Sequence, residues 1–412
     1  MSVSFKQEVL DNGLTVIAEV DPNAHTAAAG FWISTGARDE DPRLMGVSHF
    51  LEHMMFKGSA NRTAEEVNLD FDNIGAVNNA FTSAEMTAYW IHLLPEHLDE
   101  GIRILADILR PALRQEDFDS EKQVILEEIA MYEDQPFWVL YEHALARFYG
   151  EHPLAHRVLG TRETVTALER DQMATYFNAR YSSDNTILAA AGAVDFDALV
   201  SLVQETCGSW EPTAPVRTNP ERVEINDKST LKLPSLSQAY LLMIAPAPDS
   251  SSLDRYPAGM LAHTLGGDDS SRLYWSLIES GIAEEAQCSF DGRDGAGEYA
   301  TWAVCAPESL EKVEGMLLEE IDSLPTKLVQ DDLDRARARI ATAAQLSSER
   351  PLGRVNRIAA SWLRRHEYTP VEEELRRFDA ITLEDLRQCA EKFPLKPTVT
   401  SFALGNSNNP SE

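Results

Sequence analysis

The pattern of hydrophobic and polar positions divides the first 200 residues of the chain into strand-like and helix-like segments. Apolar and polar residues alternate over 14–20 and 26–35. With the Asp-Asn-Gly turn before the first run, this predicts a hairpin-like pair of strands. Helical periodicity follows over 46–56, and a second helix over 63–75 is predicted to stop at Gly75. The N-terminal part is therefore expected to start a sheet and then cover it with helices.

The same alternation of elements continues further along the chain. Residues 78–94 are rich in Thr, Tyr, Trp, Phe and Ile, the residues that favour strands. Two long helical stretches follow over 98–110 and 117–134, and 186–195 supplies another strand. Strands interrupted by long helical inserts predict an α+β fold, in which helices cover a largely antiparallel sheet.

The second half of the chain repeats part of this pattern after a proline-rich break. Residues 210–234 contain four prolines and no sustained periodicity, which is typical of a linker. Beyond it, 237–248 resembles the strand 26–35, and 254–267 takes the place that the helix 46–56 holds in the first half. A diverged duplication and two independent domains both remain open. The predicted segments are a first half 1–212, a linker 213–232 and a related second half 233–412.

Composition and charge limit the classes of partner. A chain of 412 residues, 43% hydrophobic and 25% charged, is typical of globular proteins with two to three domains. Asp and Glu outnumber Lys and Arg by 67 to 36, a net charge of −31, which repels phosphate backbones and anionic lipids. We therefore expect neither nucleic acid nor membrane as a partner. The acidity either keeps the protein soluble or selects cationic substrates, and the sequence leaves both open.

The cysteines and the N-terminal segment bear on the cellular compartment. The four cysteines are widely separated and form no Cys-x-x-Cys pair, so neither a disulfide framework nor a thiolate zinc site is expected. The first 20 residues lack a basic flank followed by an apolar run, and nowhere do 18 apolar residues follow one another. The expectation is a cytoplasmic protein, with a removed leader as the alternative.

The sequence His-Phe-Leu-Glu-His within the predicted helix 46–56 places ionisable groups in apolar surroundings. His49 and His53, four residues apart, share one face of a helix, with Glu52 beside them. Two imidazoles and one further carboxylate can bind zinc and leave a fourth position for water, whose proton a neighbouring glutamate can take. This order of residues is the inverted zincin motif. The alternative is a chance spacing, but ionisable groups in apolar company are usually paired or bound to metal.

A third ligand is available in the predicted helix 117–134. Glu121 and Glu128 are seven residues apart and project from one face, whereas Glu127 points about 100° away. Glu128 is the candidate ligand, and Glu121 the candidate to orient a ligating imidazole. An acidic helix without a metal is the alternative in a chain so rich in carboxylates.

Three segments resemble the pitrilysin-like inverted zincin metallopeptidases, the family of insulin-degrading enzyme, mitochondrial processing peptidase of the beta type and short bacterial zinc peptidases. Residues 49–58 resemble the family's zinc helix, 78–90 its substrate strand, and 120–136 the helix that carries its third ligand. The resemblance covers 8–210 and weakens through 265–283. It implies a fold of two related helix-covered antiparallel-sheet halves.

The resemblance also implies roles for individual residues. One zinc ion per chain would be bound by His49, His53 and Glu128. Glu52 would be the general base, and Glu121 would support the site. In the family an edge strand accepts the peptide substrate as an added β-strand, which makes Asn79 and Ala80 the expected substrate contacts.

We predict a zinc-dependent endopeptidase that hydrolyses extended peptides in a chamber formed by two chains. One alternative is a catalytically weak or inactive assembly subunit that keeps the peptidase fold. Another is a protein that stores zinc or is only stabilised by it. The retained His-x-x-Glu-His motif argues against an inactive subunit.

One departure from the family pattern concerns the oligomer. Active relatives carry an Arg and a Tyr in the second half, where this chain has Ile278 and Glu284. Arg272 and Tyr274 lie nearby but match a preceding structural motif. A homodimer and a heterodimer with a related chain that supplies the Arg and Tyr are therefore both expected possibilities.

Overall fold

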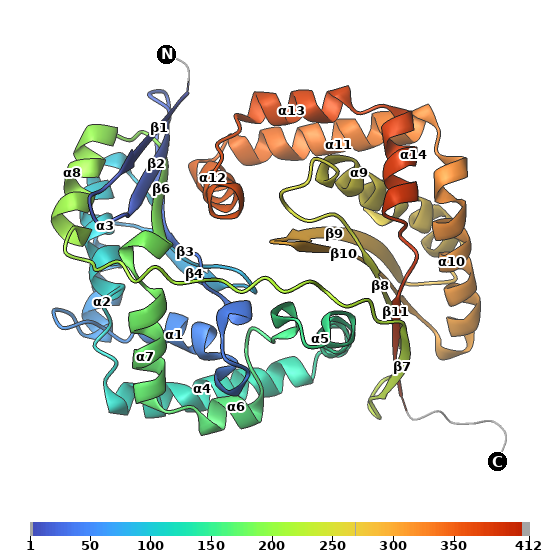
Figure 1. Ribbon diagram of the computed structural model, residues 1–412, viewed down its shortest axis with the longest axis horizontal. Helices are drawn as coiled ribbons and strands as arrows, with labels where there is room; N and C mark the ends of the chain where they lie inside the picture. Colours follow the sequence, from blue (N-terminus) through green and yellow to red (C-terminus); the bar gives the residue numbers. More distant parts are fainter. Residues whose placement is uncertain (1–2, 268, 406–412) are drawn as a thin grey trace. The chain divides into compact units, whose positions relative to one another are not determined.

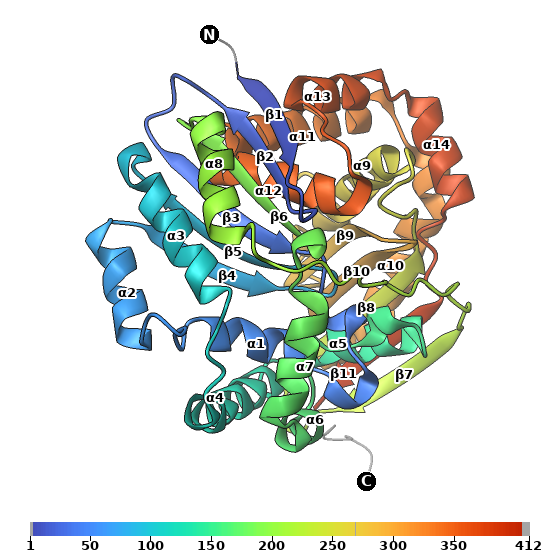
Figure 2. The same cartoon turned by 60° about the vertical axis from the view of Figure 1, so that its left-hand side comes forward.

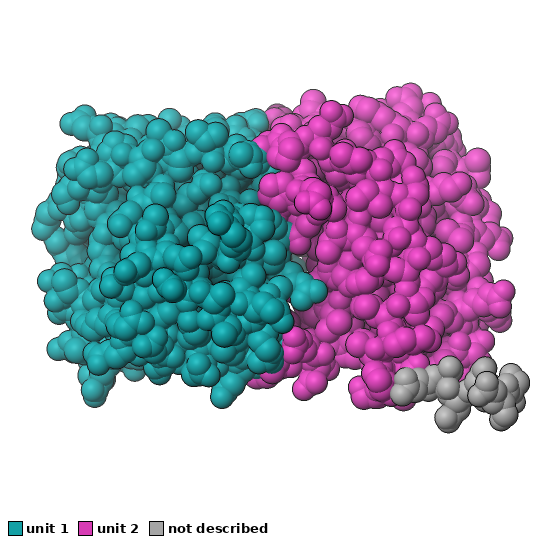
Figure 3. Space-filling view, turned by 60° about the horizontal axis from the view of Figure 1, so that its bottom comes forward, with its two compact units in different colours: residues 1–129, 156–218, 345–369 teal, residues 130–155, 219–344, 370–412 magenta. Residues whose placement is uncertain are grey.

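The computed structural model describes residues 3–267 and 269–405, which form two compact units (Figure 1). Figure 3 colours the units separately. Unit 1 consists of Met1–Ile129, His156–Thr218 and Gln345–Thr369, and unit 2 of Ala130–Ala155, Asn219–Ala344 and Pro370–Glu412. The predicted halves were continuous in sequence, whereas each unit here includes one segment from the other half of the chain.

Unit 1 is built on a six-stranded sheet in the order β1-β2-β6-β3-β5-β4. All neighbours pair antiparallel except β2 and β6, which are parallel. The strands are β1 (Ser4–Val9), β2 (Thr15–Val20), β3 (Ala27–Ile33), β4 (Val77–Thr82), β5 (Thr87–Leu93) and β6 (Thr186–Gly192).

The predicted hairpin between 14–20 and 26–35 was wrong, because β6 lies between β2 and β3. The turn before 14–20 instead joins β2 to β1, the strand that precedes it. Gly13 in this turn has φ +89°, a conformation that glycine adopts without steric cost. The single strand predicted over 78–94 is likewise a hairpin of β4 and β5.

Helices cover both faces of the unit 1 sheet, because its central strands are apolar on both sides. All residues of β3 and β6 are buried. One face packs against a large core that includes residues of α1, α3, α7 and α8, and the other against α12. Figure 2 shows α3 and α8 together over the sheet. The helices are α1 (Val47–Met55), α2 (Ala64–Asn73), α3 (Leu98–Ile108), α4 (Gln115–Glu133), α6 (Arg162–Ala167), α7 (Arg170–Arg180), α8 (Phe196–Cys207) and α12 (Pro351–Arg365).

Unit 2 contains a five-stranded sheet in the order β7-β11-β8-β10-β9. Its strands are β7 (Asp227–Lys232), β8 (Ala239–Pro246), β9 (Glu285–Arg293), β10 (Ala296–Cys305) and β11 (Val399–Leu404). The last six residues of the predicted linker 213–232 thus form β7. The helices are α5 (Pro136–Tyr149), α9 (Arg255–Gly266), α10 (Leu310–Lys327), α11 (Gln330–Ser348), α13 (Val371–Ala380) and α14 (Leu383–Lys392). Helix α5 packs on β8 and β11.

The two sheets share one topology. Apart from β1, which extends the unit 1 sheet beyond β2, each sheet has its first strand (β2 or β7) paired parallel with its last strand (β6 or β11), and the remaining pairs are antiparallel. The order β2-β6-β3-β5-β4 of unit 1 therefore corresponds strand for strand to β7-β11-β8-β10-β9 of unit 2. Helix α9 follows β8 as α1 follows β3. The chain is a two-unit α+β protein whose sheets repeat one pattern. No helix in the described residues has both the length and the apolar character required to cross a membrane.

Candidate metal centre

The start of helix α1 is fixed by the backbone conformation of Gly46 and by the side chain of Glu40. Gly46, its N-cap, has φ +96°, and a Cβ there would approach the carbonyl oxygen of Leu159 to 2.6 Å. The carboxyl group of Glu40 accepts hydrogen bonds from the backbone N–H groups of Gly46 (2.7 Å) and Ser48 (2.8 Å). These are N–H groups that a helix leaves without an internal partner, so Glu40 fixes the first turn of α1.

Aromatic packing brings α4 against α1. Phe50 of α1 and Phe118 of α4 are fully buried and stack with ring centroids 4.7 Å apart. Beyond Phe118, the face of α4 that carries Glu121, Ile125 and Glu128 turns toward the histidines, while Glu127 is exposed. The contact between two apolar faces therefore places the carboxylates next to the imidazoles.

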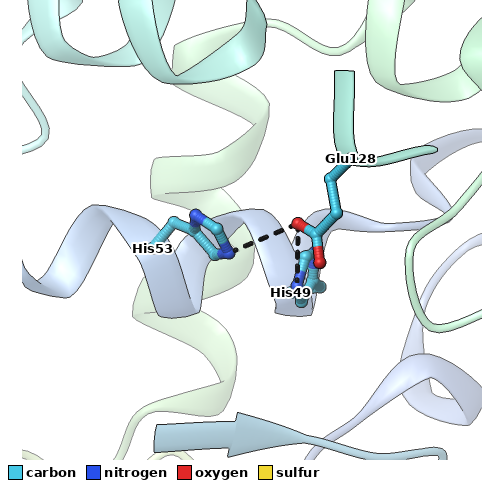
Figure 4. A group of neighbouring side chains, drawn as sticks. All are labelled: His49, His53 and Glu128. Atoms are coloured by element: carbon cyan, nitrogen blue, oxygen red, sulfur yellow. Dashed lines mark ion pairs between the residues drawn. The ribbon is translucent and has the colours of Figure 1, made fainter. Parts of the chain in front are cut away.

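His49, His53 and Glu128 form one cluster (Figure 4). Glu128 Oε2 lies 3.7 Å from Nε2 of His49 and 3.7 Å from Nε2 of His53. One ligand atom from each of the three residues lies within 4.8 Å of the others. Four-coordinate zinc with bonds near 2.0–2.1 Å separates its donor atoms by roughly 3.4 Å, so the observed spacing fits a zinc ion with little adjustment.

The protonation state of His49 also suits a metal ligand. Burial, together with the nearby His53, lowers the pKa of His49 to about 3. Its imidazole is therefore neutral at neutral pH, the form that coordinates metals. Nδ1 of His49 is buried without a hydrogen-bond partner among the described residues, and the ring is held edge-on to His53 with centroids 4.7 Å apart.

His53 is instead oriented by a chain of charged groups. Its Nδ1–H donates to Glu121 Oε1 at 2.9 Å, which leaves Nε2 on the side of Glu128. The other oxygen of Glu121 lies 2.5 Å from Nζ of Lys57. Burial tends to raise the pKa of Glu121, but the bonds from His53 and Lys57 outweigh it and lower the pKa. Sequence reasoning missed Lys57, which lies in the turn after α1, four residues beyond His53.

Glu52 lies beside the cluster and bonds to a different element. Thr82 Oγ1, at the end of β4, donates to Glu52 Oε2 at 2.5 Å. Burial raises the pKa of Glu52, an effect that this bond and His53 oppose. A carboxylate with a raised pKa is a better proton acceptor from water than an exposed one. Thr82 was also missed as a site residue, because the sequence does not indicate which strand side chain reaches the helix.

The predicted substrate contacts lie on the edge strand β4, which pairs only with β5 in the sheet. Asn79 is exposed, whereas Ala80 packs partly against the core. The backbone N–H of Ala80 donates to Oδ1 of Asn79 at 2.8 Å. Ala80 lies two residues before Thr82 and therefore on the same face of the strand. Their contact with substrate stays a prediction.

The residues at the departure from the family pattern lie in unit 2. Ile278 packs partly against the unit 2 core, and exposed Glu284 accepts a hydrogen bond from Gln238 (2.5 Å). Arg272 pairs with Asp332 at 2.6 Å, and Tyr274 donates to Glu279 at 3.1 Å. Both alternative donors are thus engaged within their own unit.

Comparisons with known proteins agree with this fold and site. The family model described as insulinase (peptidase family M16) matches residues 15–162, and that of the peptidase M16 inactive domain matches 167–340. A protein of Mycobacterium leprae named as an uncharacterized zinc protease is 32% identical over 402 residues, which is 95% of this chain and 89% of that protein.

Solved structures share the fold over almost the whole chain. The crystal structure of a protease from Helicobacter pylori has a TM-score of 0.90 at 21% identity, covering 98% of this chain and 100% of that chain. A chain of complex III from Candida albicans has a TM-score of 0.85 at 20% identity, covering 97% of this chain and 96% of that chain. Sequence, fold and the clustered His, His and Glu side chains lead to one assignment: the chain belongs to the M16 family of peptidases.

Proposed function

We propose that this protein is a zinc endopeptidase with one zinc ion per chain. The observation that supports it most directly is the cluster of His49, His53 and Glu128. Glu52 directly precedes His53 in helix α1. Relatives named as zinc proteases support it further. Zinc, when bound, acts as a Lewis acid and lowers the pKa of a water molecule.

The residues of the site have separate roles in binding the ion, orienting its ligands and transferring a proton. His49, His53 and Glu128 hold the ion, and Glu121 keeps the ring of His53 in the orientation that directs Nε2 toward Glu128. Glu52 takes the proton of the attacking water and passes it to the departing amine. The Thr82 hydroxyl fixes one oxygen of Glu52.

Peptide substrates would bind along β4 as an added strand. An edge strand leaves backbone groups free for an incoming chain, so affinity depends little on side chains. At Ala80, the incoming strand would compete with the local bond to Asn79. Extended peptides are therefore substrates, and stably folded proteins are not.

We further propose that the working form contains two chains, either a homodimer or a heterodimer. In the heterodimer, the partner supplies the Arg and Tyr that Ile278 and Glu284 replace. The ties of Arg272 to Asp332 and of Tyr274 to Glu279 support this, because neither residue is free to substitute. Mass and specific activity of the purified chain distinguish the two: a fully active homodimer refutes the need for a partner.

The decisive experiment compares Glu52→Gln with Glu65→Gln, an exposed glutamate in the first turn of α2. Zinc content and hydrolysis of a mixed set of unfolded peptides are measured for both. Glu52→Gln should keep its zinc and lose at least about 100-fold in kcat, because only the proton acceptor is missing. Glu65→Gln should match the wild type. Near-normal turnover by Glu52→Gln refutes the proposed mechanism.

A second candidate is a non-catalytic assembly subunit, favoured by the structural likeness to a chain of complex III. It predicts no peptide hydrolysis by the wild type under any metal condition. Zinc binding without hydrolysis would instead indicate a protein that zinc only stabilises. The same measurements therefore separate all three functions.

A further inference from the structure

A cleft in unit 1 lies apart from the metal centre. It has a volume of about 730 Å³ and is bordered by residues from the end of α3, from α7 and from the segment that follows α8. None of His49, His53 or Glu128 lines it. The volume lies within the range of about 300–1,000 Å³ that is usual for small-molecule sites. Nothing in the proposed peptidase reaction uses this cleft.

Arg110, two residues beyond α3, lines the cleft, and its guanidinium lies over two aromatic rings. Its Cζ lies 3.6 Å from the ring centroid of Trp210 and 5.6 Å from that of Phe177. Nη1 donates to the backbone oxygen of Leu109 at 2.8 Å. Stacking of this kind fixes the plane of the guanidinium and hence the direction of its remaining N–H donors.

Arg110 has no anionic partner within the described residues. The other two arginines of the cleft both have one: Arg62 pairs with Asp107 at 2.9 Å, and Arg103 with Glu205 at 2.8 Å. In the part of the chain that the structure describes, only one of the five N–H donors of Arg110 has a protein acceptor. Carboxylates are abundant in this chain, with 67 Asp and Glu against 36 Lys and Arg, yet within the described residues none forms an ion pair with Arg110.

The cleft wall has two carboxylates, those of Asp107 and Glu211, and among the described residues neither forms an ion pair with Arg110. Asp107 is neutralised by Arg62 and accepts hydrogen bonds from Ser59 and Asn61, both at 2.6 Å. Burial lowers the pKa of Arg110 to about 10, so the guanidinium remains charged at neutral pH.

We propose that this cleft binds a small organic molecule through a carboxylate or phosphate group that forks onto Arg110. A planar guanidinium with free N–H donors matches the two oxygens of such a group. Polar side chains on the same wall, those of Asn178 and Ser209, can contact the rest of the ligand. Because none of the proposed zinc ligands lines the cleft, this proposal can be tested separately from the proposed peptidase function.

Calorimetric titration of the full chain tests the site with three probes: succinate as the carboxylate, pyrophosphate as the phosphate, and neutral succinamide. Wild type should bind succinate or pyrophosphate, and the probe that binds more tightly shows whether the natural ligand carries a carboxylate or a phosphate group. Succinamide should not bind. Arg110→Gln should weaken binding about tenfold or more, because it removes charge-assisted hydrogen bonds.

Two further variants complete the test. Arg110→Lys keeps the charge and the stem but loses the fork, so it should bind several-fold more weakly even if Arg110→Gln fails to fold. Arg222→Gln is the matched control: Arg222 lies 4.2 Å from the ring centroid of Phe148, has no carboxylate partner in the described residues and is outside the cleft. It should bind like the wild type. The proposal is overturned if neither anion binds or if succinamide binds equally. It is also overturned if both Arg110 variants retain wild-type affinity, because an anion bound to the zinc ion would be insensitive to changes at Arg110.

Discussion

Lys57 Nζ lies 2.5 Å from one carboxylate oxygen of Glu121, whose other oxygen accepts the Nδ1–H of His53 at 2.9 Å. A cation four residues after His53 therefore holds the carboxylate that orients the imidazole. Glu121 is buried, with only 4% of its surface exposed, so its charge depends on these two partners. The metal centre therefore includes Lys57 as the partner of Glu121.

Replacing Lys57 by Met should weaken zinc binding by about 10- to 100-fold, the usual effect of losing a group that supports a ligating histidine. The physical reason is that an unpaired Glu121 tends to take up a proton and then orients His53 less well. Competition with a zinc chelator measures the affinity. Lys6→Met, at an exposed lysine 3.9 Å from Asp197, is the control. Equal zinc affinity in both variants would contradict a role for Lys57.

Replacing Thr82 by Val should lower kcat by about tenfold without loss of zinc. The Thr82 hydroxyl donates to Glu52, and this bond opposes the rise in pKa that burial causes. Without the bond, the pKa of Glu52 rises further and its carboxylate is less well placed. The pH profile of kcat/KM should move its acidic limb to higher pH. Thr175→Val is the control and should leave the profile unchanged, because the Thr175 hydroxyl donates to the backbone oxygen of Asp171 in α7.

Zinc should raise the melting temperature of the wild type but not of His53→Ala. A ligand that binds only the folded state adds about 2.7 kcal/mol at a concentration of 100 Kd. His53→Ala removes one of the three ligands and should lose the ion and the activity while keeping both cores. His25→Ala, at an exposed histidine, is the control and should respond to zinc like the wild type. A similar zinc-induced rise in His53→Ala would show that the ligand set is wrong.

The stability of the protein should depend on pH through Glu40. Burial raises the pKa of Glu40 from 4.5 to about 8, against the backbone N–H groups of Ser48 and Gly46 that favour the charged form. Because the pKa of Glu40 is higher in the folded than in the unfolded state, protonated Glu40 contributes to the free energy of unfolding. This contribution is complete below pH 4.5 and is lost as the pH rises to about 8. The loss is roughly 5 kcal/mol at most.

Urea unfolding between pH 4.5 and 8.5 measures this contribution, with Glu40→Gln as the comparison. The free energy of unfolding of the wild type should fall with pH relative to that of Glu40→Gln, which has no proton to lose at this position. Parallel curves would mean that the two N–H groups of α1 keep Glu40 charged throughout.

The sequence by itself determined which residues share a face of a helix. The spacing of His49 and His53, with Glu52 beside them, follows from the 3.6-residue period, as does the common face of Glu121 and Glu128. In the first half, strands β2, β3 and β6 and helices α1 to α4 were likewise predicted, because each carries a local hydrophobic period; in the second half the prediction reached only β8 and α9. These features depend on neighbours a few residues away, which a sequence records directly.

The tertiary structure alone decided which of these faces meet. It placed β6 between β2 and β3, brought the carboxylate face of α4 to α1, and packed α12 on the unit 1 sheet. It also joined Thr82 to Glu52 and stacked Arg110 on Trp210, which lies 100 positions later in the sequence. Such pairings depend on how apolar surfaces from distant segments are buried together. A local period specifies that a face is apolar, but not which other face covers it.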